Sequence, residues 1–211
     1  MTMKKKLQIT IVCLSVILCT LVTGTIAWLT DKTDPVTNTF TPSNISISLT
    51  EDNKGDNYNF QMIPGKTYAK DPKVTVTTDI PCYVFVKIEK ANGFDDFMAY
   101  AVADGWTQLK DADGNTVLGV YSRVVPGEAT QKAFSVLGAG SVVVGGKTYS
   151  WEADQVLIRP DVTKAMMNAF YNADGSLNTN VKQPTLTFTA YAIQQEGFGT
   201  AELAWAEISK Q

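Results

Sequence analysis

The most suggestive group of polar residues is an acidic turn, DADGN, formed by Asp111, Asp113 and Asn115. Alternating oxygen-bearing side chains suit a calcium ion, because that hard cation prefers oxygen ligands. An EF-hand loop also needs Gly at its sixth position and Glu at its twelfth, where this sequence has Thr116 and Ser122. We therefore interpret DADGN as a hairpin turn, and the run NADGSLNTN around Asp174 in the same way.

Groups that could catalyse a reaction are scarce. The sequence has no histidine, which removes the central group of Ser-His-Asp and Cys-His systems and of HExxH zinc sites. Carboxylate-only and Ser-Lys mechanisms stay open. Asp95 and Asp96 are adjacent, but consecutive residues point apart, whereas a glycosidase pair must converge on its substrate. We expect a solvated loop there, and no catalytic residue, metal site or cofactor.

Several aromatic residues could line a carbohydrate platform: Trp106, Tyr121, Tyr149 and Trp151. Aromatic residues at such positions are also common in the cores of β-rich proteins, where they bury a large apolar area. The core interpretation is preferred.

The first residues of the chain have the pattern of a secretory signal. Lys4, Lys5 and Lys6 precede an apolar run from Leu7 to about Val22. Small residues follow at Thr25 and Ala27, which predicts cleavage before Trp28. This divides the chain into a signal peptide, residues 1–27, and a secreted domain, residues 28–211. The alternative is a retained membrane anchor, since the apolar stretch is long enough to span a bilayer.

Composition limits the partners of the secreted domain. Removal of residues 1–27 takes Lys+Arg from 18 to 15 and leaves 21 Asp+Glu, a net charge of −6. An acidic domain without a basic stripe is a poor ligand for nucleic acid, so none is expected. Cys13 and Cys19 lie in the signal segment, so Cys82 would have no partner for an intrachain disulfide. The membrane is expected as a partner only through the uncleaved signal.

The remaining chain is patterned as short strands. In ISISL, Ile45, Ile47 and Leu49 alternate with serines, as in a half-buried strand. In CYVFVKIEK both faces are apolar, which predicts a central strand covered on both sides. Further short runs are separated by glycine-containing turns, and QPTLTFTAYAIQ predicts another long strand. Regular short strands favour a mainly β fold, an antiparallel sandwich.

Two short helices are expected among these strands. Asp161 is the predicted N-cap of VTKAMMNAFY, and Thr200 is the predicted N-cap of AELAWAEISK. Each segment carries apolar residues at helical spacing.

Several segments together resemble a known family: MKKKL, GTIAWLTD, NTF, ISISLTE and MIPGKTYAKDPKVTV. They are similar to the camelysin/TasA-like family of exported proteins of the Firmicutes. The resemblance implies a jelly-roll-like β-sandwich and a signal that is removed by a SipW-type signal peptidase. It also implies, for some members, fibres in the biofilm matrix. Camelysin is a metal-dependent peptidase, but without histidine there is no ordinary zinc site to carry over.

Three functions are compatible with these observations. The preferred one is a secreted, non-enzymatic structural protein of the cell surface or biofilm matrix, which associates with itself or with other matrix proteins. The alternatives are a camelysin-like peptidase and a surface module that binds a glycan or a protein. For assembly, we expect the segment freed by cleavage to add as a strand to another subunit. Its candidate anchors are Trp28, Leu29, Val36 and Phe40.

Overall fold

The computed structural model describes Met3, residues 44–51 and residues 62–210. The predicted signal peptide, its cleavage site at Thr25, Ala27 and Trp28, and the candidate anchors Leu29, Val36 and Phe40 lie outside the described residues. Residues 42–211 form one compact unit, and only this unit is described below. Among the described helices, none is long and apolar enough to cross a membrane.

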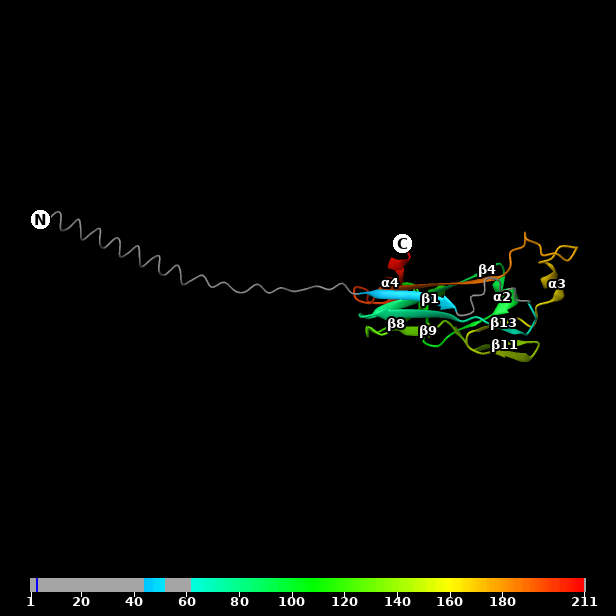
Figure 1. The fold of residues 1–211 in the computed structure, drawn as a ribbon, viewed down its shortest axis with the longest axis horizontal. Coiled ribbons are helices and arrows are strands. Elements are labelled where there is room, and N and C mark those ends of the chain that lie inside the picture. Colours follow the sequence, from blue (N-terminus) through cyan, green and yellow to red (C-terminus); the bar gives the residue numbers. More distant parts are fainter. Residues whose placement is uncertain (1–2, 4–43, 52–61, 211) are drawn as a thin grey trace. The chain divides into compact units, whose positions relative to one another are not determined.

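Two antiparallel sheets form the main body of this unit (Figure 1). The three-stranded sheet has the order β1 (Ile45–Glu51), β3 (Pro72–Thr78), β9 (Lys132–Ser135). The four-stranded sheet has the order β14 (Thr185–Gln194), β4 (Cys82–Ala91), β8 (Thr116–Val125), β7 (Thr107–Lys110). The predicted mainly β, antiparallel sandwich is therefore confirmed.

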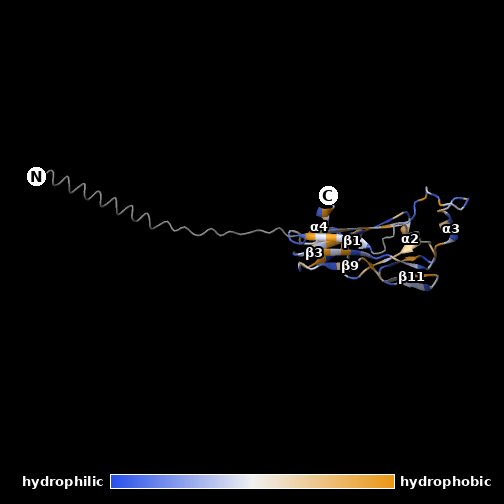
Figure 2. Ribbon diagram, in the orientation of Figure 1, coloured by the Kyte–Doolittle hydropathy of each residue, from blue (hydrophilic) through white to orange (hydrophobic). Residues whose placement is uncertain are grey.

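The main core fills the space between these two sheets. Alternate residues of β3 are buried, among them Val74 and Val76, and they pack with Val84 and Val86 of β4. Ile45, Ile47 and Leu49 add the inward face of β1, so the alternation read in the sequence is the one that the sheet uses. Figure 2 shows the corresponding change between orange and paler residues along the sandwich strands.

The outer face of the four-stranded sheet is covered by α4 (Ala201–Ile208). Phe85 of β4 is fully buried, and the centre of its ring lies 5.3 Å from the centre of the Trp205 ring. Because Val84 and Val86 face the other side, β4 is covered on both faces, as predicted. The predicted cap of α4 is also confirmed, since the Thr200 side chain accepts a hydrogen bond from the Leu203 N–H.

The rest of the unit consists of smaller sheets and two short helices. A three-stranded sheet has the order β2 (Thr67–Ala69), β13 (Gln155–Ile158), β5 (Met98–Ala99). Two pairs complete the strands: β10 (Leu137–Gly138) with β6 (Ala101–Val102), and β11 (Gly140–Val144) with β12 (Lys147–Trp151). A separate apolar cluster around Phe97, Ile158, Val162 and Phe170 packs the β2–β13–β5 sheet against α2 and the segment that contains α3.

Three helices, rather than the expected two, lie in the described part of the chain. The additional one is α2 (Phe94–Phe97), a single turn whose two phenylalanines are buried. It begins after Gly93 in the left-handed conformation, and it replaces the solvated loop expected at Asp95 and Asp96. Two buried aromatic rings stabilise a turn that the helical propensity of four residues could not.

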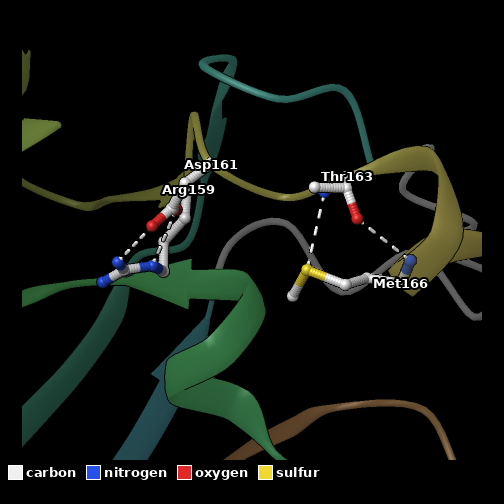
Figure 3. A network of polar contacts seen from close by, with 4 residues as sticks. All are labelled: Arg159, Asp161, Thr163 and Met166. Atoms are coloured by element: carbon white, nitrogen blue, oxygen red, sulfur yellow. Dashed lines mark hydrogen bonds and ion pairs between the residues drawn. The ribbon is translucent and has the colours of Figure 1, made fainter. Parts of the chain in front are cut away.

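The predicted cap of α3 (Lys164–Asn168) at Asp161 was wrong, because the N-cap is Thr163 (Figure 3). Thr163 Oγ1 accepts a hydrogen bond from the Met166 N–H at 3.2 Å, and Met166 Sδ accepts one from the Thr163 N–H at 3.5 Å. Asp161 instead binds Arg159, whose Nε and Nη2 lie 3.0 and 2.7 Å from its two carboxylate oxygens. The Asp161 carboxylate is therefore already bound by Arg159, two residues before the N-cap Thr163.

Candidate functional site

The margins of the sandwich are the places where another chain could join it. Among the described strands, β1 and β9 at the margins of one sheet, and β14 and β7 at those of the other, have one hydrogen-bonded neighbour each. An edge strand presents N–H and C=O groups along its free side, and proteins normally shield them. The two margins of this sandwich are shielded differently.

The margin formed by β1 and β14 is covered by a lysine. Lys70 Nζ lies 2.8 Å from Glu51 Oε1 at the end of β1. The same ammonium group lies 5.6 Å from the centre of the Phe188 ring on β14. Lys70 therefore connects both sheets, with a carboxylate and an aromatic face as its partners.

The opposite margin, formed by β7 and β9, is covered by an arginine between aromatic rings. Arg123 Cζ lies 3.7 Å from the centre of the Phe134 ring and 5.0 Å from that of the Trp106 ring. The two rings meet edge to face, with an interplanar angle of 82°. The guanidinium therefore lies in a corner made by a ring from β9 and a ring that immediately precedes β7. We call Trp106, Arg123 and Phe134 the arginine corner.

Strand pairing explains why Arg123 points into this margin. Arg123 is paired with Val84 across β8 and β4, and paired residues project from the same face of a sheet. Val84 belongs to the core between the two sheets, so Arg123 also faces that space. The corner itself is fixed by a hydrogen bond between the sheets, in which Trp106 Nε1 donates to the Ser135 carbonyl at 2.9 Å.

Gly105 completes the surroundings of the guanidinium. A Cβ atom at this position would lie 2.7 Å from Arg123 Nη2. The backbone at Gly105 therefore approaches the charged group closely, and a side chain there would displace it.

The charge of Arg123 is not balanced within the described part of the chain. Among residues 44–51 and 62–210, no carboxylate lies within ion-pair distance of Arg123, and no acceptor receives a hydrogen bond from its five N–H groups. Burial lowers the pKa of the Arg123 guanidinium, and no neighbouring acid opposes that shift. Arg123 stays charged at neutral pH nonetheless, because the ordinary pKa of an arginine side chain lies far above neutrality.

The second arginine of the sequence shows the opposite arrangement. Arg159 holds Asp161 in a two-bond fork, and the pKa of the Arg159 guanidinium is raised by that hydrogen bond (Figure 3). A planar guanidinium is suited to bind a carboxylate in this way. Arg123 has the same donor groups, but among the described residues no carboxylate binds them.

The acidic turn predicted from DADGN is confirmed as a hairpin turn between β7 and β8. Asp111 Oδ1 accepts hydrogen bonds from the backbone N–H groups of Asn115, at 2.8 Å, and Asp113, at 3.0 Å. The hydrogen bond from the Asn115 N–H has the largest effect on the Asp111 carboxyl. Together these bonds lower the pKa of that carboxyl below its ordinary value of 3.8. Asp174 forms the same kind of turn with Ser176.

The remaining acidic candidates are dispersed. Asp95 Oδ2 binds Lys90 Nζ at 2.6 Å on the surface. Within residues 44–51 and 62–210, no group of three or more His, Cys, Asp or Glu side chains is placed to hold a metal ion.

The aromatic residues that could have formed a carbohydrate platform belong mostly to the core. Trp106 and Trp151 are buried, and Tyr121 packs against the main core. Burial also raises the pKa of the Tyr121 hydroxyl. Tyr149 is half-buried on β12, with Lys147 Nζ 4.9 Å from its ring centre. The core interpretation is therefore confirmed for the two tryptophans and for Tyr121.

Sequence reasoning missed Arg123. One signal was present: it is one of two arginines in the chain, and it lies in the otherwise apolar strand TVLGVYSRVV. Its aromatic neighbours come from two other segments, which the sequence does not connect.

No family model matches the chain, and no curated protein matches it.

Proposed function

We propose that the protein is a secreted structural component of the cell surface or biofilm matrix, and that it assembles into fibres by strand donation. The observation that supports this proposal is that the sandwich has edge strands: β1, β7, β9 and β14 each have one hydrogen-bonded neighbour among the described strands. An extended segment can pair with such an edge through backbone hydrogen bonds.

The donor in this proposal is the segment WLTDKTDPVTNTF, residues 28–40. It is too polar to build a core of its own, but Trp28, Leu29, Val36 and Phe40 could enter pockets of an acceptor. Pro35 lacks an N–H, so the added strand would bend there or lie at an outer edge. Release of the segment by a SipW-type signal peptidase would delay assembly until after export.

The test compares the chain that begins at Trp28 with a truncation that begins at Thr41. Electron microscopy and light scattering should detect fibres for the longer chain and none for the truncation. A matched control replaces Val36 and Phe40 with serine, which preserves the length of the segment and removes two anchors. This variant should assemble poorly. If the truncation polymerises as readily as the longer chain, strand donation is wrong.

A further inference from the structure

We propose that β11 is an interface strand, and that its partner is β11 of a second copy of this chain, paired antiparallel across a two-fold axis at Val142. This contact goes beyond the proposed strand donation, because it needs only the described part of the chain. A two-fold contact closes on itself. It would therefore join two fibres side by side, and it would not lengthen either of them.

The free side of β11 is open to a second chain. β11 pairs with β12 alone, and no other residue in the described part of the chain forms a hydrogen bond with it. Ser141 and Val143 are exposed, Val143 to 66%. A Cβ atom added to Gly145 or Gly146, in the turn of the hairpin, would meet nothing within 4 Å. Figure 1 shows β11 at an outer margin of the unit.

Other edge strands are protected by charged residues or by covering groups, as is usual in proteins. The margin of β1 and β14 is covered by Lys70, and β7 ends in Lys110. The free side of β9 is occupied, because the Ser135 carbonyl accepts a hydrogen bond from Trp106 Nε1 at 2.9 Å. The sequence of β11, GSVVV, contains neither a charged residue nor a proline. Its three valines favour an extended strand.

The turn of the hairpin determines which backbone groups of β11 point outward. Gly145 and Gly146 both have positive φ angles, 57° and 78°, as in a two-residue type I′ turn. The pair that closes such a turn, here Val144 and Lys147, exchanges both of its hydrogen bonds. Hydrogen-bonded and non-hydrogen-bonded pairs then alternate along the hairpin. The N–H and C=O groups of Val144, and of every second residue before it, therefore point toward β12.

Ser141 and Val143 are thus the two residues of β11 whose N–H and C=O groups point away from β12. When Val142 lies opposite its own copy, Ser141 of each chain lies opposite Val143 of the other. Each of these pairs exchanges two hydrogen bonds, so all outward groups of both strands are satisfied. An axis at Ser141 or Val143 would instead place one of these residues opposite a position outside β11. Because β11 is neutral, no like charges meet in the paired strands.

Disulfide formation in the chain that begins at Trp28 tests this register. Cys82 is the only native cysteine of that chain, and it is fully buried. The Cα atoms of the two Val142 residues would lie about 4.5 Å apart, within the range that a disulfide spans. Val142→Cys should therefore give a covalent dimer under mild oxidation with diamide.

Val144→Cys is the matched control, because it lies on the same face of the same strand. In the proposed register its Cα would be displaced from its copy by about 13 Å along the strand, beyond the limit of about 7 Å for a disulfide. Its yield of covalent dimer should be at least about tenfold lower than that of Val142→Cys.

A second pair of variants keeps the test valid if Val142→Cys impairs folding. Ser141 and Val143 are exposed, so cysteine at either position leaves the core intact. A mixture of Ser141→Cys and Val143→Cys chains, one of them carrying a mass tag, should form mixed dimers in preference to either homodimer. The reason is that these two positions lie opposite each other only between different chains.

A charge on the free edge should weaken the contact. Val143→Lys, added to Val142→Cys, should lower the dimer yield about tenfold, because it places two like charges near each other between the paired strands. Thr148→Lys is the control, since Thr148 is exposed and lies opposite Val143 on β12, away from the free edge. It should change the yield less than about twofold.

The yield is read on a denaturing gel, so it does not depend on whether the chain forms fibres. Equal yields from Val142→Cys and Val144→Cys, a mixture without preference for mixed dimers, or no effect of Val143→Lys would overturn the two-fold contact. Covalent dimers of the expected register in a chain that forms no fibres would support this contact and reject strand donation. Fibres in which Val142→Cys gives no covalent dimer would do the reverse.

Discussion

Gly119 offers the sharpest test of the sandwich geometry. It lies within β8 at a φ angle of +72°, in the left-handed region. A Cβ atom built there would lie 2.3 Å from the carbonyl oxygen of Ile88, on the neighbouring strand β4. The adjacent β7–β8 pairing shifts register, and Gln108 Nε2 holds this irregular stretch by donating to the carbonyls of Val117 and Val120, at 2.8 and 2.9 Å. The neighbouring strand β4 therefore leaves no room for a side chain at Gly119.

The size of the effect follows from two separate costs. An L-residue in the left-handed conformation costs about 1–2 kcal/mol. Forcing extra atoms into a packed region costs about 1–3 kcal/mol more, because here the strand itself must shift. Gly119→Ala should therefore lower the free energy of unfolding by about 2–5 kcal/mol.

Gly114 is the matched control. Its φ angle is +83°, and a Cβ atom there would meet nothing within 4 Å. Gly114→Ala should therefore cost about 1–2 kcal/mol, the conformational term alone. The difference between the two losses of unfolding free energy therefore measures the cost of the steric contact between residue 119 and the Ile88 carbonyl.

The assay is equilibrium unfolding in urea, followed by fluorescence of the buried tryptophans. Both variants should keep the wild-type dependence of the unfolding free energy on urea concentration. Both should unfold at a lower urea midpoint, and the shift should be larger for Gly119→Ala. Equal shifts for the two variants, within about 0.5 kcal/mol, would refute the reasoning, because the contact with Ile88 would then contribute nothing.

Two further predictions concern the core and the hairpin turn. Phe85→Ala should cost about 3–5 kcal/mol in urea unfolding, because Phe85 is fully buried against Trp205, whereas Leu203→Ala on the exposed side of α4 should have little effect. Equal losses would mean that α4 does not pack as described. The second prediction concerns pH. The pKa of the Asp111 carboxyl is lower in the folded chain than its ordinary value of 3.8. The ionised carboxylate therefore stabilises the fold fully above pH 3.8, and this stabilisation is lost as the pH falls through the lowered pKa. Asp111→Asn should therefore reduce the difference in urea midpoint between pH 7 and pH 3, and an unchanged difference would count against the turn geometry.

Local patterns in the sequence were sufficient to predict several strands, one hairpin turn and one helix cap. The alternation of Ile45, Ile47 and Leu49 follows from the two-residue period of a strand and required no knowledge of its partner. The apolar residues on both faces of β4 indicated two layers around it, and the structure has the sheet on one side and α4 on the other. Asp111 and Thr200 were equally predictable, because a turn or cap is decided by hydrogen bonds within a few residues.

Other features could not be predicted from local patterns. Two residues near the start of α3 have the chemistry of an N-cap, and the sequence did not show that Asp161 binds Arg159 and leaves the cap to Thr163. The single turn α2 forms because two phenylalanines are buried, which its sequence alone could not indicate.

The arginine corner depends entirely on tertiary structure. Trp106, Arg123 and Phe134 come from three segments, and nothing in their spacing links them. They meet because strand pairing turns Arg123 toward the opposite sheet, and because the Trp106 indole binds the Ser135 carbonyl across the margin. Local sequence specifies which face of a strand is apolar, whereas only the packing of two sheets specifies which side chains meet between them.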